Sequence, residues 1–330
     1  MLEVREFIEK MKEEIRDYLP DDVYREIIID DVEVVKMNDQ NLHGLTFRMP
    51  GSDAAPTLYV DEMYQAYKDG ADFGYLTTEM ANMYSASRNA VKPPEIDLSY
   101  DKIKDNLTVR LLEKKRNREF LMSTPHVSVG HGLAVIADIN MGEDRGGDWR
   151  IAINNNVLES LGVDKETLFA QAMKNSAVVE PAMLIDMSSA LFSPERVNLL
   201  DREEPIAPED IGGMYVLTNA SGSLGAAALF YPDVKEKAAE LLGSDYYILP
   251  SSVHEVILVP DAPGITEKEL CDMVKQANRT VVDEKDILSD NVYHYSRGDR
   301  GLEKVNLDRE RGDMVAEGRY TLWRFASTER

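Results

Sequence analysis

The chain has 330 residues, of which 37 are basic and 60 acidic, so its formal net charge is −23. A charge of this sign and size disfavours binding to the phosphate backbone of nucleic acids and to anionic membranes, and neither is expected as a partner. Hydrophobic residues make up 43% of the chain, which is enough for a globular core. The length allows about two domains of ~150 residues each.

The cysteine count and the hydropathy indicate the compartment. A single cysteine, Cys271, excludes an internal disulfide and a metal site built from several thiolates. The charged start lacks the apolar core of a signal peptide, and no stretch reaches the ~18 apolar residues of a membrane span. We therefore expect a soluble protein of the reducing cytoplasm, with no cofactor and no metal.

The alternation of helical and strand patterns predicts an α+β protein with a mixed sheet, packed helices and a smaller N-terminal α/β region. Four segments are expected: an N-terminal helix-strand-helix region over 1–92, a connecting helix over 93–124, a main α+β domain over 125–295 and a charged C-terminal tail over 296–330. The first boundary depends on Pro93 and Pro94, because consecutive prolines forbid helix and favour an extended linker.

The N-terminal region begins with an amphipathic helix. Residues 3–19 place apolar side chains at helical spacing, and Pro20 ends the helix. Asp61 is placed to cap another helix, which Gly70 ends. Strands are expected over residues 24–36, 44–49 and 56–60, and one more helix over residues 71–88.

The connecting helix is predicted from residues 99–121, where Ile103, Leu107 and Leu111 are spaced to lie on one inner face. The basic residues of the run 114–118 (KKRNR) form the densest cationic patch in the chain. The simplest interpretation is a solvated helix end, because cations suit the negative end of the helix dipole. The alternative interpretation is an anion-binding patch.

The middle of the main domain begins with a predicted hairpin. Residues 219–223 are turn formers and join a strand over 214–218 to a return strand over 225–231. A helix is expected over residues 232–242, with Gly243 as its left-handed stop.

Two interior strands are expected to follow. Residues 246–249 and 253–259 are apolar with little alternation, which is typical of strands covered on both faces. Pro250 and the serines after it predict a kink between the two strands, since proline is not tolerated in mid-sheet.

The remaining elements surround this centre. Strands are expected over residues 125–140, 149–153 and 314–325, helices over 154–161, 164–175 and 266–278, and a long surface loop or lid over 193–209. Asp164 is predicted to cap one helix, and Thr266 with Glu269 to form a capping box on another. The inner face of the last helix is expected to carry Leu270, Met273, Val274 and Ala277, with Cys271 beside them.

Residues 251–255 contain the residue types of a hydrolytic triad. The candidates are Ser251, Ser252, His254 and Glu255. On a strand, Ser252 and His254 would share a face but lie ~6.6 Å apart, too far for a serine–imidazole hydrogen bond without a kink. The simpler interpretation is that these groups satisfy the backbone around Pro250 and bond within the sheet or at its rim.

Three further residues are candidates for a binding surface. Tyr293, His294 and Tyr295 are expected to complete a polar cleft beside the serines, or a charged interface. The five histidines are scattered, and no phosphate-binding glycine motif is present.

Several runs together resemble a bacterial domain-of-unknown-function family, number 5688, typical of anaerobic gut bacteria. The runs are MYVLTN at 214–219, GAA at 225–227, YILPSSVHEVIL at 247–258, GLTFR at 44–48, APTLYV at 55–60, YQAYKDG at 64–70, PH at 125–126 and LSDNVYHY at 288–295. The resemblance covers most of residues 1–296 and leaves the charged tail after Arg297 outside. It implies no activity, since the family has none assigned.

Three functions follow as hypotheses. The favoured one is a non-enzymatic binding or assembly protein, with a protein partner and an oligomeric state that the sequence leaves open. The first alternative is a hydrolase-like enzyme with a Ser/His/Glu cleft at residues 251–255. The second is an acidic mimic of DNA that occupies a DNA-binding partner.

Overall fold

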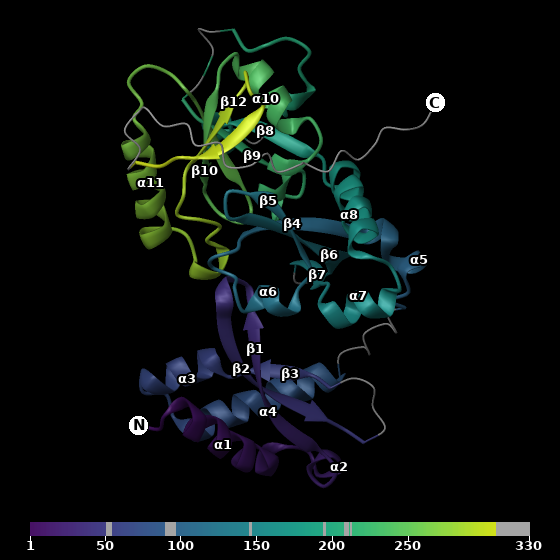
Figure 1. The fold of residues 1–330 in the computed structure, drawn as a ribbon. Coiled ribbons are helices and arrows are strands. Elements are labelled where there is room, and N and C mark those ends of the chain that lie inside the picture. Colours follow the sequence, from purple (N-terminus) through teal and green to yellow (C-terminus); the bar gives the residue numbers. More distant parts are fainter. Residues whose placement is uncertain are drawn as a thin grey trace. The chain divides into compact units, whose positions relative to one another are not determined.

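The computed structural model describes residues 1–50, 55–89, 97–144, 147–193, 196–207, 211 and 213–307. The chain divides into two compact units, Met1–Asp97 and Leu98–Arg330, whose ribbons are drawn in Figure 1. The linker expected at Pro93 and Pro94 lies outside the described residues, as does the strand expected over residues 314–325.

The first unit is an antiparallel three-stranded sheet with helices. Its elements are α1 (Val4–Glu14), η1 (Ile15–Tyr18), α2 (Asp21–Tyr24), β1 (Ile28–Lys36), η2 (Met37–Asp39), β2 (Gln40–Arg48), β3 (Thr57–Tyr59), α3 (Asp61–Lys68) and α4 (Phe73–Asn89). The strand order is β1-β2-β3. These elements confirm the helices and strands expected in the N-terminal region, except that Asp21–Tyr24 form the short helix α2, and the strand expected from residue 24 begins at Ile28.

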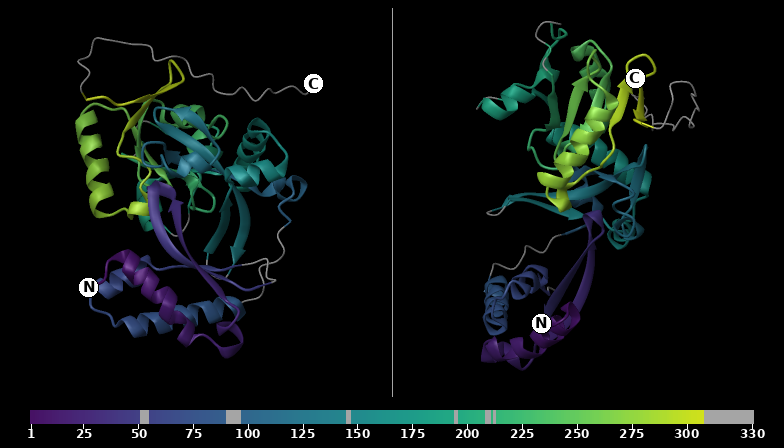
Figure 2. Two further views of the ribbon diagram at one scale, coloured as in Figure 1. Left: turned by 60° about the horizontal axis from the view of Figure 1, so that its bottom comes forward. Right: turned by 90° about the vertical axis from the view of Figure 1, so that its left-hand side faces the viewer.

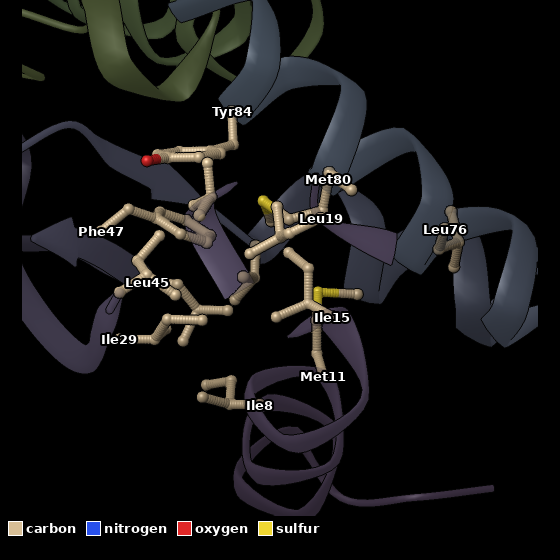
Figure 3. Packing of buried hydrophobic residues seen from close by; sticks show 14 of the residues in the cluster. Ile8, Met11, Ile15, Leu19, Ile29, Leu45, Phe47, Leu76, Met80 and Tyr84 are labelled. Atoms are coloured by element: carbon tan, nitrogen blue, oxygen red, sulfur yellow. The ribbon is translucent and has the colours of Figure 1, made fainter. Parts of the chain in front are cut away.

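The core of this unit lies between α1, the sheet and α4 (Figure 3). Met11 and Ile15 are fully buried on the apolar face that the helical spacing predicts. Phe47 of β2 stacks on Tyr84 of α4, with ring centroids 4.7 Å apart. Only one face of the sheet is covered in this way, since Ile29 is buried while its neighbour Ile28 is 46% exposed.

The second unit begins with a four-stranded antiparallel sheet. Its elements are α5 (Tyr100–Ile103), η3 (Lys104–Asn106), β4 (Leu107–Glu113), α6 (Phe120–Ser123), β5 (His126–Gly130), β6 (Leu133–Asp144), β7 (Gly147–Ala152), α7 (Asn155–Leu161) and α8 (Lys165–Val179). The cap expected at Asp164 is confirmed, since its side chain accepts a hydrogen bond from the Thr167 backbone at the start of α8. Helix α7 ends at Gly162, which is left-handed at φ 66°.

The connecting helix predicted over 93–124 is wrong. Of the described residues before β4, Tyr100–Ile103 are α-helical and Lys104–Asn106 form the short 3-10 helix η3. The chain then becomes β4, which pairs with β6 along its whole length. Leu107 and Leu111 are four residues apart, which fits one face of a helix and also, with Val109 between them, one face of a strand. Pairing with a distant strand decides between the two. The basic run 114–118 therefore follows a strand, and the interpretation of it as a helix end is also wrong.

A six-stranded sheet forms the rest of the second unit. Its elements are β8 (Ala182–Asp186), α9 (Met187–Phe192), η4 (Leu199–Asp201), β9 (Tyr215–Asn219), η6 (Gly225–Phe230), α10 (Val234–Leu242), β10 (Tyr246–Pro250), β11 (Val256–Pro260), α11 (Glu267–Thr280), η7 (Glu284–Asp286), β12 (Tyr293–Ser296) and β13 (Gly301–Lys304). The strand order β13-β12-β10-β11-β9-β8 confirms that β10 and β11 are interior.

Helices cover both faces of this sheet. Tyr247, Leu249 and Val259 point to one face and pack against α11, which lies beside the sheet in Figures 1 and 2. Tyr246, one residue earlier, points to the other face, where its hydroxyl donates to the backbone oxygen of Lys235 in α10. The α+β class is therefore confirmed, and every strand pairing among the described residues is antiparallel where a mixed sheet was expected.

Three local predictions in this region need correction. The return strand expected over residues 225–231 is the 3-10 helix η6, because Leu224 takes a left-handed conformation at φ 53° and turns the chain out of the sheet direction. The charged tail expected from residue 296 begins with the last residue of β12 and a turn, and then contains the strand β13, which pairs with β12. On α11 the capping box is confirmed, but Met273 is 44% exposed, and Asn278 takes an inward position.

No helix in the described ranges has both the length and the hydropathy that a bilayer span requires.

Candidate functional site

A pocket of about 320 Å³ opens on the face of the six-stranded sheet that α11 also covers. Its floor is a row of three side chains, Ile185, Val216 and Ile257. These residues stand directly opposite one another on the neighbouring strands β8, β9 and β11. The register of the sheet therefore builds a flat apolar floor.

Helix α9 forms one wall of the pocket, with Met187, Ala190 and Leu191. The helix starts at Asp186, the last residue of β8, whose carboxylate accepts from the backbone N–H groups of Ser188 and Ser189. The Ser188 hydroxyl also donates to this carboxylate and, with the backbone donors, lowers the pKa of Asp186 below its usual value against the effect of burial. The ionised cap thus fixes α9 at the edge of the floor.

The opposite end of the pocket is polar and comes from the turn between β10 and β11. Ser251 donates to Oε1 of Glu255 over 3.1 Å, and Ser252 donates to the same oxygen over 3.4 Å. The Ser252 backbone N–H donates to the Glu255 backbone oxygen over 3.2 Å and closes the turn. The two serines therefore orient one carboxylate oxygen of Glu255, and no described residue donates to the other, Oε2.

His254 lies in the same turn with its ring bonded elsewhere. Its Nδ1 accepts from the backbone N–H of Leu224 over 3.1 Å, and its Nε2 lies 3.5 Å from Oδ1 of Asp286. Its backbone N–H donates to Oγ of Ser252, and its backbone oxygen accepts from the Thr218 hydroxyl. The structure gathers all four predicted residues in one turn but pairs the serines with Glu255 instead of the imidazole.

Tyr293, His294 and Tyr295 do not line the pocket. Tyr293 and Tyr295 are buried, and burial is the main cause that raises the pKa of each to about 12. The Tyr295 ring stacks on Tyr246, which points to the face opposite the pocket. His294 lies against Tyr247, with its Nε2 3.4 Å from Asp261.

Arg196 is a charged pocket residue that is not among the candidates from the sequence. It is exposed and has no hydrogen bond or ion pair with the described part of the chain, and its Nη1 approaches Gly222 of the loop after β9. The sequence placed it inside the acidic loop or lid of residues 193–209. A cation in an acidic loop is the one signal that the sequence offers for it, and the loop holds a second cation, Arg202, that does not line the pocket.

The described residues give no sign of a metal centre. In these ranges no three His, Cys, Asp or Glu side chains gather as metal ligands. His126, one of the scattered histidines, has its Nδ1 beside the backbone oxygen of Thr124.

The comparison with family models finds one match over both units. The model described as a family of unknown function (DUF5688) matches residues 4–297. The match includes the pocket floor, the turn of residues 251–255 and the loop carrying Arg196, and it ends where the resemblance predicts, at the charged stretch after Arg297. No curated protein and no solved structure matches the chain. The chain belongs to the DUF5688 family of unknown function.

Proposed function

We propose that the protein is a non-enzymatic binding protein whose pocket takes a small zwitterionic molecule with an apolar body, such as an apolar amino acid. The observation that carries this proposal is the position of two opposite charges, Arg196 and Glu255, around one apolar floor. A molecule with an ammonium group, a carboxylate and a hydrocarbon side chain has a complementary partner for each of its parts in this pocket.

The chemistry of each wall supports this class of ligand. A guanidinium binds a carboxylate through two parallel hydrogen bonds, which Arg196 has its donors available to make. Oε2 of Glu255 is an acceptor for an ammonium group, and the serines hold the carboxylate in place. Ile185, Val216 and Ile257 offer the hydrophobic surface. The volume of about 320 Å³ lies at the small end of the range for ligand sites, ~300–1,000 Å³.

Thermal unfolding in the presence of L-leucine, L-methionine and L-phenylalanine tests the proposal. At least one of them is expected to raise the melting temperature, because a ligand that binds only the folded state stabilises it. Glycine, which lacks the apolar body, is the control and is expected to have no effect. The proposal fails if no apolar amino acid raises the melting temperature, or if glycine does so equally.

The hydrogen bonds of the turn support binding over hydrolysis. A serine nucleophile needs a base that accepts its proton, and the imidazole is the usual one. Here Nδ1 of His254 accepts from the backbone N–H of Leu224, its Nε2 lies 3.5 Å from Asp286, and both serines donate to Glu255. A serine-directed fluorophosphonate is therefore expected to leave the intact mass unchanged. An adduct on Ser251 or Ser252 would establish the hydrolase instead.

The proposal includes a cytoplasmic location. Cys271 is buried, and burial is the main cause that raises the pKa of its thiol, so the cysteine stays in the unreactive thiol form. This suits a chain that forms no internal disulfide. Fractionation of cells that express the protein is expected to place it with cytoplasmic markers, and recovery with the membrane fraction would contradict this part of the proposal.

A further inference from the structure

A second cavity of the same unit, of about 500 Å³, shares no residue with the pocket described above. It lies where the turn after β4, the second half of α11 and the segment after α11 meet. Three of its lining residues are cations, Arg116, Lys275 and Arg279. In a chain with a net charge of −23, a cavity with three cations departs from the general character of the surface.

Arg116 is held in place by a set of hydrogen bonds. Its Nη2 donates to Oδ2 of Asp290 over 2.9 Å, and its Nε lies 3.7 Å from Glu113. The buried amide of Asn278 donates to Oδ1 of Asp290 over 2.8 Å and to the backbone oxygen of Ser289 over 3.0 Å. These bonds fix the guanidinium at the cavity wall, with donors to spare, because a guanidinium carries five N–H groups.

Asp290 is ionised and neutralises part of this charge. Burial pushes the pKa of Asp290 upward, but the hydrogen bonds from Asn278 and Arg116, with the charge of Arg116, outweigh burial and leave the pKa below its usual value. Lys275 and Arg279 supply the remaining positive charge of the cavity, and Glu284 supplies its other negative charge.

Lys275 and Arg279 are exposed, and neither has a hydrogen bond or ion pair within the described part of the chain. They are four residues apart on α11, so they stand on one side of the helix. The helix dipole accounts for a cation in the last turn of α11, where Arg279 lies. It does not account for Arg116, which reaches the same cavity from a distant turn.

We propose that this cavity binds a small phosphate monoester. At neutral pH such an ester carries close to two negative charges. The three cations of the cavity outnumber its two carboxylates, Asp290 and Glu284, so the cavity favours an anion. The guanidinium groups of Arg116 and Arg279 suit the geometry of phosphate oxygens, and Lys275 adds a point charge. Val282 and Ile287 offer the carbon part of the ester an apolar surface, and Glu284 accepts from a hydroxyl group.

Calorimetric titration of the full chain at pH 7.5 with glycerol 2-phosphate tests this proposal. Saturable binding is expected, with glycerol and sodium chloride at matched concentration giving none. Inorganic phosphate is expected to bind more weakly, since it lacks the carbon part. Absence of saturable binding by the ester would overturn the proposal, and equal affinity for inorganic phosphate would overturn the role given to the apolar wall.

Two variants of α11 separate a specific site from general charge attraction. Arg279→Glu is expected to weaken ester binding at least about tenfold, the loss of one charge-assisted contact. Lys268→Glu changes the net charge equally on an exposed position of the same helix outside the cavity and is expected to leave binding unchanged. Equal weakening in both variants would overturn the site. Arg279→Glu is also titrated with L-leucine, whose binding to the first pocket this substitution is expected to leave unchanged. The two sites are thereby tested separately.

Discussion

The imidazole Nδ1 of His254 accepts a hydrogen bond from the backbone N–H of Leu224, 3.1 Å away. This bond joins the turn after β10 to the loop after β9, where Leu224 holds a left-handed conformation at φ 53°. Because Nδ1 is the acceptor, the ring proton of the neutral imidazole sits on Nε2, which faces Asp286. The histidine therefore serves as a connector between two loops around the pocket.

Replacement of His254 tests this connection. His254→Ala is expected to lower the free energy of unfolding by about 1–2 kcal/mol, because the Leu224 N–H is left without its acceptor. His254→Asn is expected to lose less, since an amide oxygen can accept in place of Nδ1. Urea denaturation of both variants provides the measurement, and equal losses would show that the hydrogen bond contributes nothing.

Gly225 is expected to tolerate no side chain. A Cβ there would lie 2.3 Å from Oγ1 of Thr218 and 2.5 Å from the Asn219 nitrogen, so the backbone would have to move. Gly225→Ala is expected to lower the free energy of unfolding by roughly 2–4 kcal/mol. Gly213→Ala is the matched control, because nothing lies within 4 Å of its Cβ. Similar stability of the two variants would contradict the close packing of η6 on β9.

The buried ion pair between Arg150 and Glu180 in the second unit predicts that substitutions of the two residues have coupled effects on stability. Arg150 donates to Glu180, and both side chains are nearly inaccessible. Asn140 and Asn219 also donate to this carboxylate. Arg150→Met is expected to lower the free energy of unfolding by about 3–5 kcal/mol, because it leaves a buried charge without its cation. Adding Glu180→Gln should recover part of this loss, and a double-mutant cycle measures it; strict additivity would contradict direct pairing.

The lowered pKa of Asp290 predicts a pH dependence of stability. A carboxyl whose pKa is lower in the folded state contributes stability above its unfolded pKa, about 4. That contribution is lost as the pH falls through the folded pKa. Asp290→Asn should therefore be less stable than the wild type at pH 7, by at most about 1 kcal/mol since the side chain is half exposed, and equally stable at about pH 2. A difference that stays constant over this range would contradict the prediction.

Local signals in the sequence predicted those parts of the fold that local physics determines. The caps at Asp164 and Thr266 and the left-handed stop at Gly243 depend on groups within a few residues of each other, and all three are confirmed. The strand over Leu107–Glu113 was missed because pairing with β6, not its own pattern, decides its conformation. The helix η6 was missed because the residue that turns the chain is a leucine, which rarely adopts a left-handed conformation.

For the candidate site too, the sequence predicts the part that neighbouring residues determine and misses the part that distant segments bring together. Pro250, the last residue of β10, and the serines after it predict the turn that carries Ser251 and Glu255, since these residue types form turns by themselves. Arg196 lines the same pocket as this turn but belongs to another loop. Arg116 lines the same cavity as Lys275 and Arg279 but belongs to the turn after β4. No spacing along the chain encodes such meetings, because they depend on which strands pair.

Calorimetric titration with three related compounds tests the binding account most directly. L-leucine offers both charges to Glu255 and Arg196, N-acetyl-L-leucine lacks the ammonium group, and L-leucinamide lacks the carboxylate. The account predicts saturable binding of L-leucine and at least about tenfold weaker binding of each of the other two, equivalent to roughly 1.4 kcal/mol per lost charge contact. Equal affinity for all three compounds, or no binding of L-leucine, would contradict it.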